Sequence, residues 1–353
     1  MRLTRIRAAD FRNLVFADVS IDAPRVFLLG DNGQGKTNLL EAAGLISAFR
    51  SFRTSDISPL LRAGCAEARL RIDVRQAADE PTEVEIRLAK GSRRGLVNGS
   101  AVTSVAQHLG QFPTIVFCSD DLRLVRGSPS NRRRWLDAAI GGTDAAYLTA
   151  VRDYGRALDG RNALLKNPQR SDEELRAFEQ AMLAPGLLIA RTRARVLPEL
   201  AESLRATCAR AGFADHGADL VYEPDAPAEQ LADLWAKTRI ADLATGTTLR
   251  GPQRDDFGVL FQAQPAADYA SEGQQRLLVL ALCLARLRRD TSRSPTPPVI
   301  LADDVLGELD DHRRKAFWAE VGTDHQVIAT GTSAPPAGDW LTYRVEAGTY
   351  LPA

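Results

Sequence analysis

The sequence predicts an α/β fold with a mixed sheet, interrupted by an inserted lobe that is mainly helical. Three observations predict this fold. A short apolar strand, a glycine-rich turn and a helical pattern follow one another over residues 26–41, VFLLGDNGQGKTNLLE. Strand-like alternation surrounds this stretch but disappears over about residues 143–212, where Ala, Leu, Arg and Glu dominate. Strand patterns then return, so both ends of the chain are expected to build one domain.

We therefore expect residues 1–140 and 246–353 to form two parts of a discontinuous head, and residues 141–245 to form the helical lobe. A hydrophobic content of 44% in 353 residues is ordinary for a globular protein with a sizeable core. The 45 basic and 45 acidic side chains cancel. Any contact with nucleic acid must therefore come from a local basic patch.

The four cysteines, Cys65, Cys118, Cys208 and Cys283, lie far apart and form no CxxC pair. This usage is typical of free thiols in a reducing compartment. The N-terminus lacks an apolar signal region, and no apolar run approaches the roughly 18 residues of a membrane span. We expect a cytoplasmic protein without a membrane partner.

In the first part of the chain, residues 2–8, 14–21, 68–75 and 82–89 alternate as half-exposed strands do. Asn98-Gly99 indicates a tight turn. The first hundred or so residues thus predict one mixed sheet around the strand at 26–29. A strand is expected at 114–118, followed by a helix at 128–140 that turns Trp135 and its apolar neighbours inward.

The middle of the chain predicts two long helical stretches with a break near 166–171, the second interrupted by Pro185-Gly186 and Pro198. Strands are expected at 219–223 and 256–262, with a helix through 228–243 between them. A helix from 271 is apolar nearly all round, which favours burial. The C-terminal part predicts strands at 299–302, 326–330 and 341–346 and a helix at 310–321.

The stretch Gly30-Asp31-Asn32-Gly33-Gln34-Gly35-Lys36-Thr37 matches G-x-x-x-x-G-K-[ST] in full, between a strand and a helix. Glycines let the backbone turn so that N–H groups face phosphate oxygens, and the helix N-terminus adds positive charge. We expect Lys36 to reach the β- and γ-phosphates of ATP and the Thr37 hydroxyl to bind Mg²⁺.

A second element suits the same chemistry. The apolar strand at 299–302 ends in Asp303-Asp304, as a Walker B strand does when it delivers carboxylates beside a P-loop. We expect Asp303 to hold the Mg²⁺ shell and Asp304 to polarise the attacking water.

With Leu309-Asp310 as a D-loop and a serine at the start of the helix at 271, these motifs resemble the ABC-type ATPase heads of SMC-like proteins. The chain is most similar to the bacterial RecF family. FRNL at 11–14, GDNGQGKTNLLEA, SDDLRLVRGSPSNRRRWLD, LRGPQRDDF, SEGQQRLLVLAL and LADDVLGELDDHRR carry the likeness over nearly the whole chain.

The resemblance implies a site shared between two chains. Ser271 and Gly273 would contact the γ-phosphate bound to a second protomer, while Arg12, Asn13 and Asn38 would lie near the nucleotide. It further implies an ATP-dependent homodimer that binds double-stranded and gapped DNA, with weak, DNA-stimulated ATP hydrolysis. RecR- and RecO-type mediators would be its partners in loading recombinase at gaps.

The sequence departs from the general ABC pattern at three places. Glu272 stands where many ABC proteins have glycine, Thr330-Gly331-Thr332 replaces the switch histidine, and no glutamine lies near Ser119. These departures indicate slow hydrolysis, suited to a timer.

Two sets of arginines leave alternatives open. Arg123, Arg126, Arg132 and Arg133 could contact DNA or form a solvated face; Arg191, Arg193 and Arg195 are a second candidate set. Arg250 and Arg254 could serve the nucleotide or pair with Asp255 and Asp256. The four tryptophans look isolated, as packing residues do.

Two other functions compete with DNA repair. An ATPase subunit of a transporter or another machine would need a coupling surface and normally a switch histidine. A P-loop kinase would need neither a signature serine nor a D-loop.

Overall fold

The structure is a computed structural model that describes residues 1–54, 56–76, 81–104, 108, 110–212, 217–294, 296–305, 310–335 and 338–353. It divides into a head unit, Met1–Asp121 with Leu287–Ala353, and a lobe unit, Leu122–Arg286. The lobe unit extends beyond the expected 141–245 range at both ends, because α4 (Pro129–Gly141) and β10 (Asp256–Phe261) pack against each other within it.

One sheet of the head unit is antiparallel and has the order β2-β1-β4-β5-β6-β7. Its strands are β1 (Arg2–Phe11), β2 (Leu14–Ser20), β4 (Glu67–Arg75), β5 (Thr82–Ala89), β6 (Ser92–Val97) and β7 (Ser100–Ala101). Asn98 and Gly99 join the last two with φ angles of 47° and 79°, the left-handed pair that a tight hairpin turn requires. The tight turn predicted there is confirmed.

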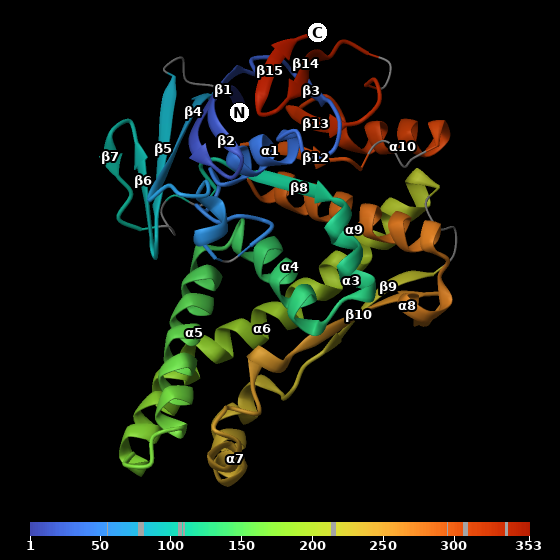
Figure 1. The fold of residues 1–353 in the computed structure, drawn as a ribbon. Helices are drawn as coiled ribbons and strands as arrows, with labels where there is room; N and C mark the ends of the chain where they lie inside the picture. Colours follow the sequence, from blue (N-terminus) through green and yellow to red (C-terminus); the bar gives the residue numbers. More distant parts are fainter. Residues whose placement is uncertain are drawn as a thin grey trace. The chain divides into compact units, whose positions relative to one another are not determined.

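The strand before the P-loop belongs to a second sheet, with the order β15-β14-β3-β13-β12-β8. These strands are β3 (Arg25–Leu29), β8 (Thr114–Cys118), β12 (Val299–Asp303), β13 (Val327–Gly331), β14 (Leu341–Glu346) and β15 (Thr349–Pro352). All pair in parallel except β15, so the sheet is mixed. The expectation of one sheet from the first hundred residues is wrong, since β3 finds its partners at the far end of the chain (Figure 1).

Helix α1 (Lys36–Gly44) joins the two sheets of the head unit. It contacts β1 of the antiparallel sheet and β12 and β13 of the P-loop sheet. One apolar core contains side chains from α1 and from both sheets, among them Ile6, Leu28, Leu39, Leu40, Ile72 and Leu301. The head unit also contains η1 (Ser58–Leu60) and α10 (Asp311–Val321). Burial of α1 on both sides thus fixes the loop that precedes it.

The lobe unit is mainly helical, as expected. Its helices are α3 (Arg123–Arg126), α4, α5 (Ala145–Leu165), α6 (Asp172–Ala211), α7 (Leu231–Thr245), α8 (Ala266–Tyr269) and the first part of α9 (Glu272–Arg293). Short 3₁₀ turns lie at η3 (Ala228–Gln230) and η4 (Pro252–Arg254), and η2 (Ser119–Leu122) leads from the head unit into the lobe unit. A small antiparallel sheet has the order β11-β10-β9, with β9 at Ala218–Glu223 and β11 at Gln264–Pro265.

Helix α6 corrects one prediction. It runs without a break through Pro185 and Pro198, although each proline removes a helical hydrogen bond. The helix packs along α5 and β9 and buries a row of apolar side chains, among them Met182, Ile189, Val196, Leu197 and Leu200. This burial offsets the roughly 3 kcal/mol that an interior proline costs. The predicted break before the helix is confirmed, because Ser171 and Glu174 form a capping box at its start.

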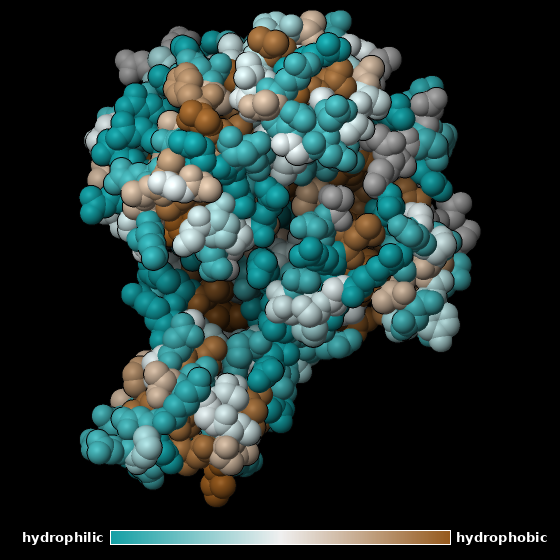
Figure 2. Space-filling model, viewed as in Figure 1, coloured by the Kyte–Doolittle hydropathy of each residue, from teal (hydrophilic) through white to brown (hydrophobic). Residues whose placement is uncertain are grey.

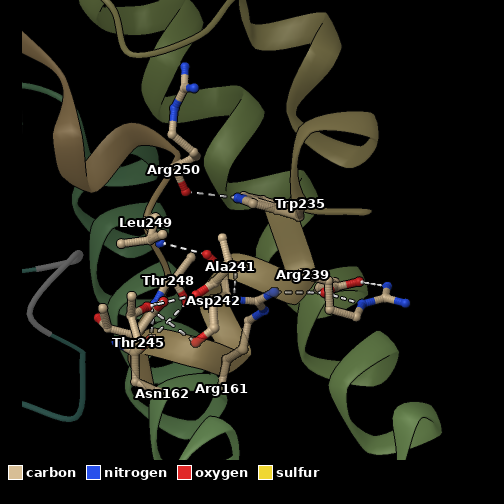
Figure 3. A network of polar contacts seen from close by, with 12 residues as sticks. Arg161, Asn162, Trp235, Arg239, Ala241, Asp242, Thr245, Thr248, Leu249 and Arg250 are labelled. Atoms are coloured by element: carbon tan, nitrogen blue, oxygen red, sulfur yellow. Dashed lines mark hydrogen bonds and ion pairs between the residues drawn. The ribbon is translucent and has the colours of Figure 1, made fainter. Parts of the chain in front are cut away.

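A buried ion network ties α5, α6 and α7 together (Figure 3). The Arg161 guanidinium, fully buried, donates to Asp242 Oδ2 at 2.8 Å and to Glu179 Oε1 at 2.9 Å. It also donates to Thr248 Oγ1 at 2.7 Å, in the loop after α7. Arg239 of α7 donates to the second oxygen of Glu179 at 2.5 Å. Each buried charge therefore has a partner of opposite sign.

Two tryptophans of the head unit are not isolated. Trp318 and Trp340 meet edge to face with ring centroids 5.5 Å apart, and the Arg25 guanidinium lies 4.9 Å from the Trp318 ring.

On the face shown in Figure 2, apolar side chains are scattered among hydrophilic ones. No helix in the described parts of the chain combines the length and apolarity needed to cross a bilayer.

Candidate nucleotide-binding site

The P-loop connects β3 to α1, and its glycines occupy conformations that other residues adopt at a cost. Gly33 and Gly35 have φ angles of 81° and 111°. A Cβ on Gly35 would also lie 3.2 Å from Leu14 and 3.3 Å from Asn13 Oδ1. At Gly30 the reason is steric, since a Cβ would lie 2.4 Å from the Val345 carbonyl oxygen. The motif's glycines are thus required by the fold around the loop.

Lys36 points back into the loop. Its ammonium donates to the Gly30 carbonyl at 2.6 Å and to the Asp31 carbonyl at 2.9 Å, and the residue is 6% exposed. Burial lowers the pKa of Lys36, while the nearby Asp304, Asp303 and Asp31 carboxylates act in the opposite direction. The cation of the motif is therefore held against the backbone of its own loop by two carbonyls.

The structure brings the two predicted halves of the site together. The Thr37 hydroxyl donates to Asp303 Oδ1 at 2.8 Å across 266 positions of sequence. Asp303 ends β12, which is separated from β3 only by β13. Burial raises the pKa of Asp303, although hydrogen bonds from Thr37 and Thr330 favour its charged form. A cation close to Asp303 would therefore stabilise the charged form of this buried carboxylate.

Thr330 is a site residue that the sequence did not reveal as such. It lies at 1% exposure on β13, and its hydroxyl donates to Asp303 Oδ1 at 2.9 Å. The Thr330 hydroxyl oxygen in turn accepts the Asp304 backbone N–H at 3.0 Å. Asp304 has a φ of 55°, an uncommon value for a residue other than glycine. Thr330, the first of the three residues that stand in place of the switch histidine, thus contacts both Walker B aspartates.

The region around Arg12 and Asn13 touches the P-loop and α1. Asn13 donates to the Gly33 carbonyl at 3.3 Å and accepts from Asn38 at 2.7 Å. Arg12 forms two hydrogen bonds with the fully buried Glu41, at 2.8 and 2.7 Å. Arg12 therefore anchors the antiparallel sheet to α1.

Glu41 also accepts from Ser51 at 2.5 Å and from Arg53 at 3.2 Å. Sequence reasoning missed this carboxylate. Its signal was a single acidic residue among the apolar positions of α1, since buried carboxylates are almost always paired.

The turn between β14 and β15 contacts the P-loop backbone. Gly348 N–H donates to the Gln34 carbonyl at 2.8 Å, and Ala347 N–H donates to Gln34 Oε1 at 2.6 Å. The Tyr350 hydroxyl donates to the Gly35 carbonyl at 2.9 Å. Tyr350 has no local sequence signal, because its partner lies 315 positions away.

The predicted signature residues lie in the lobe unit at the start of α9. Ser271 N–H donates to Gln274 Oε1 at 2.8 Å, and Gln274 N–H donates back to Ser271 Oγ at 3.4 Å. Ser271, Glu272 and Gly273 are exposed. A Cβ on Gly273 would meet nothing within 4 Å. Packing within the chain therefore does not require this glycine.

The arginines proposed for DNA differ in their surroundings. Arg132 forms two hydrogen bonds with Asp256, at 2.7 and 2.6 Å, and its side chain is 14% exposed. Arg133 donates to the Asp255 carbonyl at 2.8 Å. Asp255 and Asp256 thus bind both side chains, so neither arginine belongs to the solvated face that was the alternative to DNA contact. Arg123 and Arg126 are exposed.

The structure also shows the surroundings of Arg193, Arg250 and Arg254. Arg193 is 4% exposed and bonded to Asp137 and Asp255, so it cannot belong to a surface set. Arg250 pairs with Asp225 at 3.0 Å, and not with the aspartates after it. Arg254 is exposed.

Of the predicted D-loop, Leu309 lies outside the described residues, and Asp310 caps α10 by accepting from Arg313 N–H.

A P-loop and a Walker B strand in one mixed sheet, with a helical lobe inserted between them, define a P-loop ATPase head of the ABC type. The comparisons agree with this class. The family model for the RecF/RecN/SMC N terminal domain matches residues 2–335. A solved Smc head domain bound to part of ScpA shares the fold, with a TM-score of 0.53 at 13% identity, covering 100% of this chain and 98% of that one.

Relatives with higher sequence identity include several proteins named RecF. The DNA replication and repair protein RecF of Synechococcus sp. (strain JA-3-3Ab) is 38% identical, covering 91% of this chain and 89% of the relative. RecF of Thermosynechococcus vestitus is 36% identical, covering 99% and 97%. The solved structure of the recombination mediator protein RecF-ATP in the RecFOR pathway aligns with a TM-score of 0.91 and 29% identity, covering 99% of this chain and 97% of that one. The chain belongs to the RecF family.

Proposed function

We propose that this protein is an ATP-dependent DNA-binding protein of recombinational repair and replication-gap rescue. In this role it acts with RecR- and RecO-type mediators to load recombinase at single-strand gaps. The proposal is supported by relatives called DNA replication and repair proteins and by a similar structure described as a recombination mediator of the RecFOR pathway.

ATP binding is the first step of the proposal. The observation that carries it is the hydrogen bond between Thr37 and Asp303, which joins the P-loop to the Walker B strand. In the proposed complex, Lys36 leaves the Gly30 and Asp31 carbonyls and donates to the β- and γ-phosphates. Gly33, Gln34 and Gly35 present backbone N–H groups to the same phosphates.

Thr37 and Asp303 fit a Mg²⁺ ion. Their hydroxyl and carboxylate are hard oxygen ligands, the kind that Mg²⁺ takes together with phosphates and water. When bound, the ion would neutralise phosphate charge and polarise the phosphoryl group. Asp304, held by Thr330 at the end of the same strand, accepts a proton from the attacking water in our proposal.

Dimerisation is the second step. Ser271 and Gly273 complete the site of a second protomer, so that ATP joins two heads and slow hydrolysis separates them. The exposed start of α9 and the open space at Gly273 support this assignment, since a partner could approach there closely. DNA binding and stimulation of hydrolysis then follow the dimer. The alternative, an ATPase subunit of a transporter, is not favoured by relatives named for DNA repair.

Retention on a duplex-DNA column, with ATP, with ADP and without nucleotide, tests the proposal. We expect retention to rise with ATP for the unaltered chain and not for Lys36→Met, which loses the P-loop ammonium. Equal retention of both chains under all three conditions would contradict the proposal.

A further inference from the structure

We infer that the C-terminal hairpin, β14 with β15, belongs to the nucleotide site and that Gln34 and Tyr350 are positioning residues for ATP binding. The inference rests on the proposed ATP binding and deepens it. It concerns the residues after 345, which no ATP-binding motif includes.

The hairpin binds the outer side of the P-loop at three points. Two backbone N–H groups of its turn donate to Gln34, one to the main-chain carbonyl at 2.8 Å and one to the side-chain oxygen at 2.6 Å. The third is the Tyr350 hydroxyl, which donates to the Gly35 carbonyl at 2.9 Å. The two carbonyls that receive these bonds are consecutive.

Peptide geometry carries this restraint to the inner side of the loop. In a trans peptide the C=O of one residue and the N–H of the next are coplanar and point in opposite directions. Fixing the Gln34 carbonyl therefore fixes the Gly35 N–H, and fixing the Gly35 carbonyl fixes the Lys36 N–H. The first N–H groups of a helix lack partners within the helix and are those offered to an anion. The Gly35 carbonyl also accepts the Asn38 and Leu39 N–H groups of α1, both at 3.1 Å, so the hairpin and the first turn of α1 together orient the donors that phosphate would meet.

The hairpin is itself firmly placed. Strand β14 pairs in parallel with β3, the strand that leads into the P-loop, with Arg344 opposite Leu29. The Val345 carbonyl comes so close to Gly30 that a Cβ there would lie 2.4 Å away. On the same hairpin, the Tyr343 hydroxyl donates to the Ser20 carbonyl at 2.6 Å, in the antiparallel sheet. Tyr343 and Tyr350 therefore offer a matched pair, one bonded to the P-loop and one bonded elsewhere.

The experiment compares Tyr350→Phe with Tyr343→Phe, since each variant removes one hydroxyl from the hairpin. Two quantities are measured: the dissociation constant for ATP, and hydrogen exchange of the P-loop amides without nucleotide. We expect Tyr350→Phe to weaken ATP binding about three- to tenfold, the effect of one hydrogen bond. Its P-loop amides should exchange faster. Tyr343→Phe should leave both quantities unchanged.

A third variant, Gln34→Ala, removes the side-chain bond to Ala347 and should speed P-loop exchange as Tyr350→Phe does. Unaltered exchange and affinity in Tyr350→Phe and Gln34→Ala would overturn the inference. So would equal losses in both tyrosine variants with a common fall in melting temperature, since the hairpin would then only stabilise the fold. Failure of the proposed function looks different, because the unaltered chain would then bind ATP no better than Lys36→Met. The exchange measurement needs no nucleotide and would still report on the hairpin.

Discussion

Thr330 shows how much one hydroxyl contributes to this site. It is buried, donates to Asp303 and accepts the N–H of Asp304, whose φ lies in the left-handed region. Such a backbone conformation persists when its surroundings hold it in place. Thr330 thus contacts both Asp303, which would bind Mg²⁺, and Asp304, which would activate the attacking water.

We predict that Thr330→Val will lower stability by about 1–3 kcal/mol, the cost of leaving buried polar groups without a partner. It should also slow ATP hydrolysis more than it weakens ATP binding, because Asp304 loses its fixed position. Thr330→Ser keeps the hydroxyl and should restore both properties. Thr332→Val, at an exposed site two residues later, is the control. Thermal unfolding and single-turnover hydrolysis check the prediction, and a Thr330→Ser variant as impaired as Thr330→Val would contradict it.

Individual site residues were predictable where they belong to a contiguous pattern. The eight residues from Gly30 to Thr37 could be assigned because the chemistry needs them next to one another. Glu41, Thr330 and Tyr350 could not be assigned in this way, since their partners come from distant strands. The pairing of Arg132 with Asp256 was hidden for the same reason.

At the scale of elements, the Arg161 network determines how α7 attaches to α5 and α6. Burial raises the pKa of Glu179, but hydrogen bonds from Arg239 and Arg161 outweigh it, so the net pKa lies below the ordinary value of 4.5. A carboxyl whose pKa is depressed by folding adds stability above its unfolded pKa and loses it as the pH falls through the folded pKa.

We predict that Glu179→Gln will destabilise the protein at pH 7, because it leaves two arginines with less opposite charge. The difference from the unaltered chain should shrink as the pH falls from about 4.5, the unfolded value, through the lower folded pKa of Glu179, where the carboxylate becomes neutral in the folded protein. Chemical unfolding between pH 7 and pH 3 measures it. Glu202→Gln, exposed in the interior of the same helix, should show no difference at any pH. A Glu179→Gln deficit that stays constant with pH would contradict the assignment.

Helices and strands were predictable from local patterns, but their grouping was not. The strand at 114–118 and the helix at 128–140 appear within about one residue of the expected bounds. The division of the first hundred residues between two sheets depends on β13 and β14, which lie more than 200 residues later. Helix α6 continues through two prolines because packing along α5, which no local pattern reports, compensates for them.

At the scale of the whole molecule, zero net charge means that DNA contact depends on which arginines face solvent. We predict that neutralising Arg123 and Arg126 together will lower the slope of duplex affinity against salt by roughly 1 for each phosphate that these side chains neutralise in the unaltered chain. Arg132→Gln should instead lower the melting temperature, because Asp256 loses its bidentate partner. Binding isotherms at several salt concentrations measure the slope, and thermal unfolding measures the melting temperature. An unchanged slope in the double variant would remove both exposed arginines from the DNA interface.

The central claim is that ATP joins the P-loop of one chain to Ser271 of another. Sedimentation of two variants, alone and mixed, tests it most directly, with Asp304→Asn present in every chain so that bound ATP persists. Lys36→Met should stay monomeric with ATP because its P-loop is impaired. Ser271→Arg should stay monomeric because, in both sites of its dimer, a large side chain would take the place of the γ-phosphate of ATP; in a dimer with the Lys36→Met chain, that side chain faces only the P-loop that binds no ATP. Mixed together, they can form one intact site, from the P-loop of one and the serine of the other. The account predicts ATP-dependent dimers only in the mixture; dimers of Ser271→Arg alone, formed as readily as those of the Asp304→Asn chain, would contradict it.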